Sequence, residues 1–309
     1  MVNPRSAILL VVLLICPWLF LGGPEYFNDR AMRGAWNLGH IPFFAMSCWL
    51  FGDFLQRRYR MRGLRLVLLL PLATLVVGLA IELIQRQVGR EFSWGDVTFD
   101  LVGCALALMC LHSVRAATPS WLVWLIATGL GVLLLWLVKP VVVALCDEYW
   151  SREHFPVLAD FSTPFEWERF DGSASFEQQV LADDNAVLVV DFGTEQYSNL
   201  DLQHFPGDWS GFAVLRFEVG NPGTQPVQLA CKIQDRRHDR RGHRFSDRYN
   251  TRIDIYPGWQ SIRIDLSEVR EAPADRTMNM RSITLFSCFT VQAKAPLQLY
   301  FDDFRLADD

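Results

Sequence analysis

The sequence lacks the short motifs that identify common catalytic and redox sites. Its 309 residues contain no Cys-x-x-Cys pair, no phosphate-binding Walker loop, no Gly-x-Ser-x-Gly elbow and no His-Glu-x-x-His zinc motif. Cysteine is scarce in the second half, where only Cys231 and Cys288 occur. The composition therefore excludes a small disulfide scaffold, and with 51% hydrophobic residues it also excludes a disordered or collagen-like chain.

An excess of positive charge is also missing, since the formal net charge is -5. Residues 1–150 carry 12 Lys and Arg against 9 Asp and Glu, a net of +3, whereas residues 151–309 carry 17 against 25, a net of -8. We therefore expect no nucleic-acid partner. The mean hydropathy of +0.14 averages two unlike halves, and the length is typical of about two domains.

Long apolar runs are confined to the first half. A membrane helix needs roughly 20 mostly apolar residues. Five segments approach that length, and they are 6–22, 37–55, 66–84, 96–113 and 121–146. Arg5 precedes the first run, as in a signal peptide, but Leu21-Gly22-Gly23-Pro24 is a poor cleavage site, so we expect a retained anchor. These runs predict an all-α membrane bundle of five transmembrane helices over residues 1–146.

The arginines predict how this bundle is oriented. The short loop 56–65 holds five arginines, and loops of this kind stay in the cytoplasm. With five spans, the N-terminus is then cytoplasmic and everything after residue 146 lies on the other side. We therefore expect the second half to be periplasmic or extracellular.

Ionisable and amide side chains gather near the predicted outer helix ends. His40 begins the second span, Glu82 and Gln85 end the third, and Asp96 and Asp100 begin the fourth. The last two pairs each share a helix face. A charge inside a bilayer costs at least about 2.5–3 kcal/mol, so these groups should face the bundle or water. In one interpretation they form a catalytic or head-group site, with Glu82 as base and His40 as acid; in the other they form interhelical hydrogen bonds.

The stretch 36–111 resembles the VanZ-like membrane family. The pieces that carry this resemblance are Asn37–Phe44, Glu82–Gln85, Arg90–Asp96 and Asp100–Gly103. The chain departs from the family pattern at Trp36-Asn37, where Asp-Lys is often found, and at Asp100, which replaces an Asn. The family is linked to the cell envelope, so the resemblance implies a location in the bacterial inner (cytoplasmic) membrane rather than a particular reaction.

The second half shows a different periodicity. Residues 147–160 are polar and aromatic, as expected of a linker at a membrane surface. Apolar and polar residues alternate thereafter in short segments separated by turn signals such as Pro257-Gly258. The alternating segments are 186–192, 212–219, 227–233, 251–255, 260–266, 282–286 and 297–301. This pattern predicts an all-β sandwich over residues 161–309.

The segments 257–266 and 299–306 resemble the galactose-binding-like jelly rolls, a group that holds many carbohydrate-binding modules. This resemblance covers about residues 160–309. It implies an envelope glycan or a lipid-linked saccharide as partner. It also raises the prospect of a structural calcium ion, for which Asp302 and Asp303 are weak candidate ligands. No other cofactor is indicated.

The candidate ligand surface is the segment 234–252, which holds seven arginines. The predicted ligand-binding residues are Asp235, Arg237, His238, Arg241, Arg244, Asp247 and Tyr249. Arginine forks suit carboxylate or phosphate. The alternative is a solvated loop in which Arg and Asp neutralise one another. Aromatic side chains such as Tyr197 and Trp259 are able to stack on sugar rings, although such residues more often serve packing.

Three functions remain open on these grounds. The first is a membrane-anchored envelope protein whose outer sandwich binds a glycan or lipid-linked saccharide and whose VanZ-like bundle engages the lipid bilayer or a partner. The second is an enzyme in which Glu82, His40 and Asp96 act on a lipid-linked phosphate or sugar. The third is a scaffold that recruits another envelope protein. Whether Cys231 and Cys288 form a disulfide also stays open.

Overall fold

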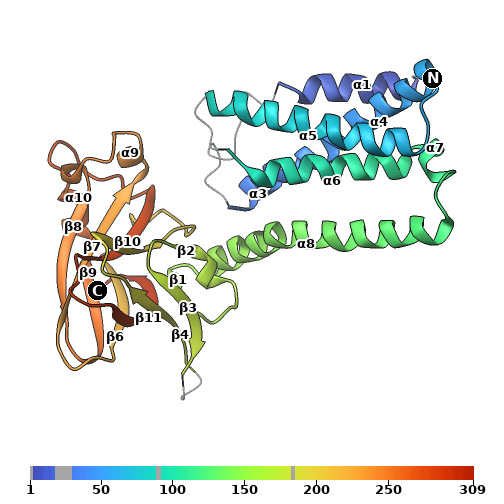
Figure 1. Ribbon diagram of the computed structural model, residues 1–309. Coiled ribbons are helices and arrows are strands. Elements are labelled where there is room, and N and C mark those ends of the chain that lie inside the picture. Colours follow the sequence, from blue (N-terminus) through green and yellow to red (C-terminus); the bar gives the residue numbers. More distant parts are fainter. Residues whose placement is uncertain (1–2, 18–29, 88–91, 182–184) are drawn as a thin grey trace. The chain divides into compact units, whose positions relative to one another are not determined.

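The computed structural model describes residues 3–17, 30–87, 92–181 and 185–309. The chain divides into two compact units, Met1–Leu145 and Cys146–Asp309. The first is helical and the second is built from β-strands, and each is labelled by element in Figure 1.

The helical unit is formed by helices that are mostly apolar. The helices are α1 (Pro4–Ile15), α3 (Arg30–Leu38), α4 (His40–Tyr59), α5 (Leu64–Gln87), α6 (Trp94–Cys110), α7 (His112–Arg115) and α8 (Ser120–Glu153). Of the described residues, three stretches form helices long and apolar enough to cross a membrane, namely 30–59, 64–87 and 120–153. The other two predicted spans coincide with the shorter helices α1 and α6, and residues 18–22 of the first lie outside the described part.

Close backbone approach organises this bundle. Gly103 of α6 faces the backbone of α4, and a Cβ atom placed on it would lie 2.4 Å from the carbonyl oxygen of Ile41. Small residues at such contacts let membrane helices pack tightly. Leu66, Leu70 and Cys104 are almost fully buried in the same cluster. The pairing of α4 with α6 therefore depends on a residue that has no side chain.

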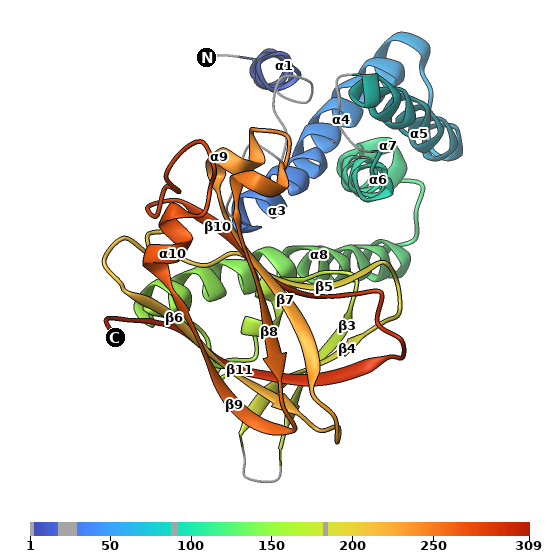
Figure 2. The same ribbon diagram turned by 90° about the vertical axis from the view of Figure 1, so that its left-hand side faces the viewer.

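The β unit is a sandwich of two antiparallel sheets. One sheet has the strand order β3-β4-β11-β6-β9, with β1 added on β11, and the other has the order β2-β5-β10-β7-β8. The strands are β1 (Val157–Ala159), β2 (Phe170–Asp171), β3 (Ser175–Val180), β4 (Ala186–Phe192), β5 (Tyr197–Leu202), β6 (Val214–Asn221), β7 (Val227–Asp235), β8 (Tyr249–Ile255), β9 (Gly258–Asp265), β10 (Ile283–Val291) and β11 (Leu297–Ala307). The short helices α9 (Arg236–Asp239) and α10 (Leu266–Glu271) lie at the same end of the sandwich (Figure 2).

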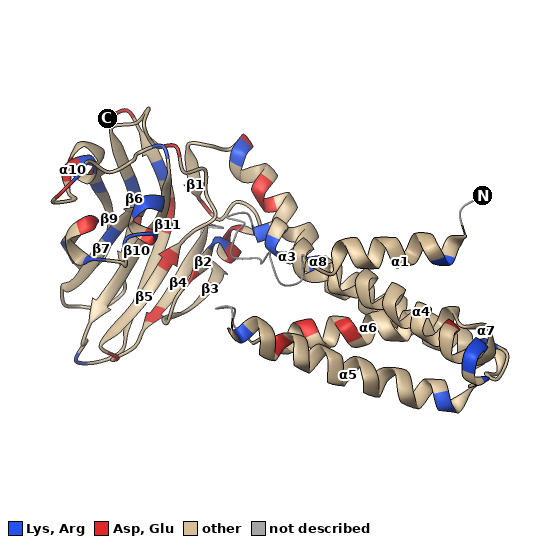
Figure 3. Ribbon diagram, turned by 90° about the horizontal axis from the view of Figure 1, so that it is seen from above, with Lys and Arg blue, Asp and Glu red and all other residues tan. Residues whose placement is uncertain are grey.

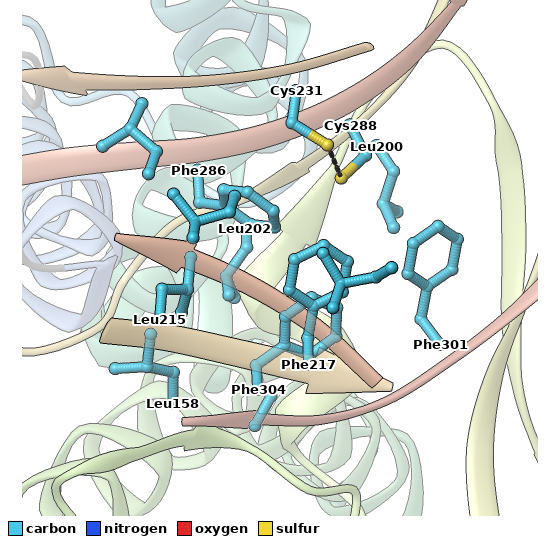
Figure 4. Packing of buried hydrophobic residues seen from close by; sticks show 14 of the residues in the cluster. Leu158, Leu200, Leu202, Leu215, Phe217, Cys231, Phe286, Cys288, Phe301 and Phe304 are labelled. Atoms are coloured by element: carbon cyan, nitrogen blue, oxygen red, sulfur yellow. Dashed lines mark hydrogen bonds between the residues drawn. The ribbon is translucent and has the colours of Figure 1, made fainter. Parts of the chain in front are cut away.

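The core lies between the sheets and follows the alternation along each strand. Phe217 of β6, Phe301 and Phe304 of β11, and Phe286 of β10 are 2% exposed or less and pack against one another (Figure 4). Burying a side chain of this size stabilises a fold by about 1.5–3 kcal/mol. The prediction of a helical first half followed by an all-β sandwich is therefore confirmed.

The segment 147–160, expected as a linker, contains the end of α8 and strand β1. Asp147 is fully buried within the second unit, where its carboxylate accepts a hydrogen bond of 2.9 Å from Nε of Arg169. Nη1 of Arg169 also donates to the carbonyl oxygen of Leu158 at 2.5 Å. Strand β1 pairs with β11, so this segment is packed into the sandwich.

Candidate functional site

One face of the β2-β5-β10-β7-β8 sheet points away from the core, and we call it the open face. Because side chains alternate along a strand, Leu200 of β5 and Cys288 of β10 enter the core while their neighbours Asn199 and Phe289 face outward. Phe289 lies opposite Asn199 on one side and opposite Ala230 of β7 on the other. Residues distant in sequence thus form continuous rows across this face.

The open face is hollowed by a cavity of about 730 Å³, which we call the groove. The residues that line the groove are Tyr197, Asn199, Ala230, Cys231, Lys232, Phe245, Arg248, Asn250, Thr251, Arg252, Phe289 and Val291. Tyr197 and Phe245 are 56% and 70% exposed. Large aromatic surfaces are therefore available at both sides of a floor that also carries amide, guanidinium and ammonium groups.

The wall formed by Phe245 is tied to the edge strand β8. The guanidinium carbon of Arg248 lies 5.5 Å from the centre of the Phe245 ring, within the range of a cation–π contact. Nε of Arg248 donates to Oδ1 of Asn250 at 2.9 Å, and Nδ2 of Asn250 donates to the carbonyl oxygen of Phe245 at 3.1 Å. These contacts hold the aromatic wall in place beside the strand.

Lys232 of β7 lines the groove beside Phe289. Its Nζ lies 6.0 Å from the centre of the Phe289 ring. Burial lowers the pKa of Lys232, an effect that Asp201 opposes and Arg248 reinforces. Burial likewise lowers the pKa of Arg248. The groove thus holds cations in a partly desolvated setting.

Two polar oxygen atoms lie next to Lys232 in the floor of the open face. Ser287 of β10 pairs with Asp201 of β5 on one side and with Lys232 of β7 on the other. Oγ of Ser287 and Oδ1 of Asp201 are buried and accept or donate no hydrogen bond within the described part of the chain. An unsatisfied buried polar group costs about 1–3 kcal/mol, so this row is suited to hydrogen bonding with a bound molecule.

Asp235 and Asp247, two of the predicted ligand-binding residues, are joined by Arg276. Nη1 and Nη2 of Arg276 donate to the Asp235 carboxylate at 2.6 and 2.8 Å, and its Nε donates to Asp247 at 2.7 Å. Burial alone would raise the pKa of Asp235, but Arg276 and two backbone N–H groups hold it below its ordinary value. The hydrogen bond with Arg276 lowers the pKa of Asp247 too. Both acids therefore fix the loop and do not line the groove.

The other predicted loop residues fall into three settings. His238 is fully buried, with Nδ1 3.5 Å from Oδ2 of Asp247, and burial lowers its pKa. Tyr249 packs in the core, and Arg237 is exposed. Arg241 and Arg244 line a separate cavity of about 410 Å³ together with Asp247. The structure thus brings some of the predicted residues together, but beside the groove.

The weak calcium candidates are engaged in other contacts. Nδ2 of Asn185 donates to Oδ2 of Asp302 at 2.8 Å, and Asp303 pairs with Arg305. Burial raises the pKa of Asp302, against the hydrogen bond from Asn185. Within residues 3–17, 30–87, 92–181 and 185–309, no group of three or more His, Cys, Asp or Glu side chains is placed to hold a metal ion.

The helical unit holds a second candidate site, which we call the polar cluster. His40, Glu82, Gln85, Asp96 and Asp100 are each 3% exposed or less. Nδ1 of His40 lies 2.8 Å from Oδ1 of Asp100, and its Nε2 lies 3.6 Å from Oδ2 of Asp96. Figure 3 shows the acidic residues of α5 and α6 in red. Buried acids around one imidazole suit either proton transfer or a tight structural network.

The connection between α5 and α6 closes the polar cluster. The backbone N–H of Ser93 donates to Oε2 of Glu82 at 2.7 Å, and Oγ of Ser93 accepts from the N–H of Asp96 at 3.2 Å. Ser93 is therefore the N-cap of α6. A Cβ atom on Gly78 would lie 2.6 Å from Oδ2 of Asp100. Helices α5 and α6 are thereby fastened together through polar contacts.

No family model and no curated protein matches the chain, but solved structures do. An exo-beta-agarase structure is 18% identical with a TM-score of 0.38, and the match covers 50% of this chain and 25% of that one. A family 11 carbohydrate-binding module from Clostridium thermocellum, in complex with a beta-1,3-1,4-mixed-linked tetrasaccharide, is 15% identical with a TM-score of 0.39 over 49% of this chain and 94% of its own. A family 29 carbohydrate-binding module is 9% identical with a TM-score of 0.33, and the match covers 49% of this chain and 90% of the module. These TM-scores are low, so the case for a ligand depends on the groove itself.

The segment 234–252, predicted as the ligand surface, supplies Phe245, Arg248 and Arg252 to the groove, and Tyr197 is one of the predicted stacking candidates. The sequence reasoning missed the residues that come from the neighbouring strands, Asn199, Lys232 and Phe289. The sequence does indicate that each of these residues faces outward, because each alternates with core residues along its strand. That signal becomes informative only when the strand order is known.

Proposed function

We propose that the β unit binds a saccharide in the groove on the open face. The observation that carries this proposal is a cavity of about 730 Å³ flanked by exposed aromatic rings and lined with amide, guanidinium and ammonium groups. Ligand pockets of roughly 300–1,000 Å³ commonly combine apolar walls with a few placed polar groups.

The mixture of side chains matches the two-sided chemistry of a sugar ring. A pyranose presents C–H groups on its faces, which pack on the rings of Tyr197 and Phe289, and hydroxyl groups around its edge. The amide of Asn199 offers N–H donors, and the guanidinium of Arg252 offers more, to those hydroxyls.

We further propose that the helical unit anchors this module in a bacterial inner membrane. Five helices would span it, with the N-terminus in the cytoplasm and the β unit in the periplasm or outside the cell. Support comes from the three long apolar helices and from the arginines of residues 56–65. The VanZ-like pattern adds to this proposal by its link to the cell envelope. The bundle would contact the bilayer and either a lipid-linked saccharide or a protein partner.

The experiment measures binding of the full chain, purified in detergent, to immobilised bacterial and plant polysaccharides. Tyr197→Ala and Phe289→Ala should each weaken retention about tenfold, as expected when an anchor residue of an interface is truncated. Trp259→Ala is the matched control, because Trp259 is a 47% exposed aromatic on the other sheet. Binding that is unaffected by both groove variants, or binding of proteins alone, would overturn the proposal in favour of a scaffold.

The polar cluster supports a second candidate function, acid–base chemistry on a lipid-linked phosphate or sugar. The supporting observation is that His40 lies between Asp100 and Asp96, and that Glu82 is joined to the start of α6 through Ser93. Glu82→Gln and His40→Ala should then abolish turnover of a lipid-linked saccharide while folded protein is still recovered, with the melting temperature of His40→Ala lowered by the loss of its contact with Asp100. Loss of folded protein in both variants would instead assign the cluster a structural role.

A further inference from the structure

Three cations, Lys232, Arg248 and Arg252, line the groove. Other buried arginines of the sandwich are paired: Arg169 with Asp147 and Arg276 with Asp235 and Asp247. Among the described residues, no carboxylate forms an ion pair with Lys232, Arg248 or Arg252. Lys232 and Arg248 are half-buried, a setting in which a cation without an ion pair is disfavoured, and Arg252 is exposed. All three are therefore placed to receive a charge from outside the chain.

Their positions form a track along one side of the groove. Asn250 and Arg252 share the open face of β8, and Arg248, which is extended and lies one residue before the strand, continues the same alternation. Arg252 lies four positions after Arg248, which is about 13 Å along an extended chain at the usual rise per residue. Lys232 lies opposite Asn250 on β7. The positive charge is therefore spread over more than one sugar ring.

The local charge opposes that of the rest of the unit. Residues 151–309 have a net charge of -8, yet Asp201, the carboxylate that raises the pKa of Lys232 and Arg248, lines the neighbouring hollow and not the groove. Long-range attraction of a polyanion by the unit as a whole is weak for this reason. Recognition would depend on short-range contacts inside the groove.

We propose that the saccharide bound in the groove is an acidic one, whose carboxylate or sulfate groups pair with Arg248, Arg252 and Lys232. This inference rests on the proposed saccharide binding. The planar guanidinium fork matches an oxyanion with two parallel hydrogen bonds, whereas Lys232 acts as a point charge beside the Phe289 ring. The aromatic rings then pack on the sugar faces while the cations fix the side of the chain that carries the anions.

The experiment compares matched neutral and charged polymers with the full chain in detergent. The probes are polygalacturonate against its fully methyl-esterified form, and dextran sulfate against dextran. We expect one charged member to bind about tenfold or more tightly than its neutral partner, which corresponds to one charge-assisted contact. The affinity should fall as the NaCl concentration rises. Comparing the affinity for polygalacturonate with the affinity for dextran sulfate identifies whether a carboxylate or a sulfate is preferred.

Two variants assign the preference to the groove. Arg252→Gln and Lys232→Gln should remove most of the difference between charged and neutral forms, whereas Arg263→Gln, an exposed arginine on the other sheet, should keep it. Equal binding of charged and neutral polymers would overturn the acidic preference but leave saccharide binding standing. A preference that survives both groove variants would overturn the assignment as non-specific charge attraction. Absence of binding to every polymer, including neutral glucans and galactans, would count against the proposed function itself.

Discussion

The link between Arg276, Asp235 and Asp247 makes a quantitative prediction about the loop that carries the Phe245 wall. In Arg276→Met the aliphatic volume is kept, but two acids that are 0% and 7% exposed lose their cation. Breaking a buried ion pair costs about 3–5 kcal/mol. We take about 3 kcal/mol, because the Arg276 side chain is 8% exposed and water reaches it. For a domain of this size, that corresponds to a fall in melting temperature of about 6–12 °C.

The assay is thermal unfolding of the full chain in detergent, followed by tryptophan fluorescence, with Arg281→Met as the exposed control. Acid dependence gives a second readout. Because the pKa values of Asp235 and Asp247 are lowered by folding, their stabilisation is complete above the unfolded pKa of about 3.9 and is lost as the pH falls through the lower folded values. Arg276→Met should lose this acid-dependent part. A melting temperature within 1–2 °C (about 0.5 kcal/mol) of the Arg281→Met control would refute the reasoning.

Three further predictions concern other parts of the chain. Gly103→Val should reduce the yield of folded protein, because its Cβ would lie 2.4 Å from the Ile41 carbonyl oxygen. The control Gly129→Val should not reduce it, because no atom lies within 4 Å of the added Cβ. Size-exclusion chromatography in detergent measures the yield of both variants. Asp100→Asn should weaken the polar cluster by about 1–3 kcal/mol through the lost charged hydrogen bond with His40, seen as a lower melting temperature, and an unchanged value would show that this contact contributes nothing. Sγ of Cys231 and Sγ of Cys288 lie 3.0 Å apart on directly paired residues (Figure 4), so protein exported to an oxidising compartment should have both thiols blocked to alkylation until reduced; free thiols there would contradict the proposed location.

The polar cluster could be predicted from the sequence because its members are fixed by local rules. Glu82 and Gln85 share a helix face by their spacing, as do Asp96 and Asp100. Charged groups in apolar helices must turn inward, and this requirement brings them to His40. The sequence could not show how closely α4 and α6 approach, because that depends on Gly103 meeting a backbone carbonyl.

The groove could not be predicted because it is a property of the sheet order. Strands β4, β6, β7 and β11 alternate clearly and were expected, whereas the polar edge strand β3 was not. Strand β5 was also missed, since only Leu200 and Leu202 mark its buried face. The row Asp201–Ser287–Lys232 comes from three strands that are adjacent in space but far apart in sequence. The charge-rich segment 234–252 was expected to bind a ligand and supplies Phe245, Arg248 and Arg252 to the groove, but its acids Asp235 and Asp247 pair with Arg276.

Hydrogen–deuterium exchange of the full chain with a bound saccharide tests the central claim most directly. We expect protection of the amides of β8 (Tyr249–Ile255) and β10 (Ile283–Val291), which line the groove. The amides of β9 (Gly258–Asp265), in the other sheet, should exchange at the same rate with and without ligand. Protection confined to β9, or absent from the open face under saturating saccharide, would contradict binding in the groove.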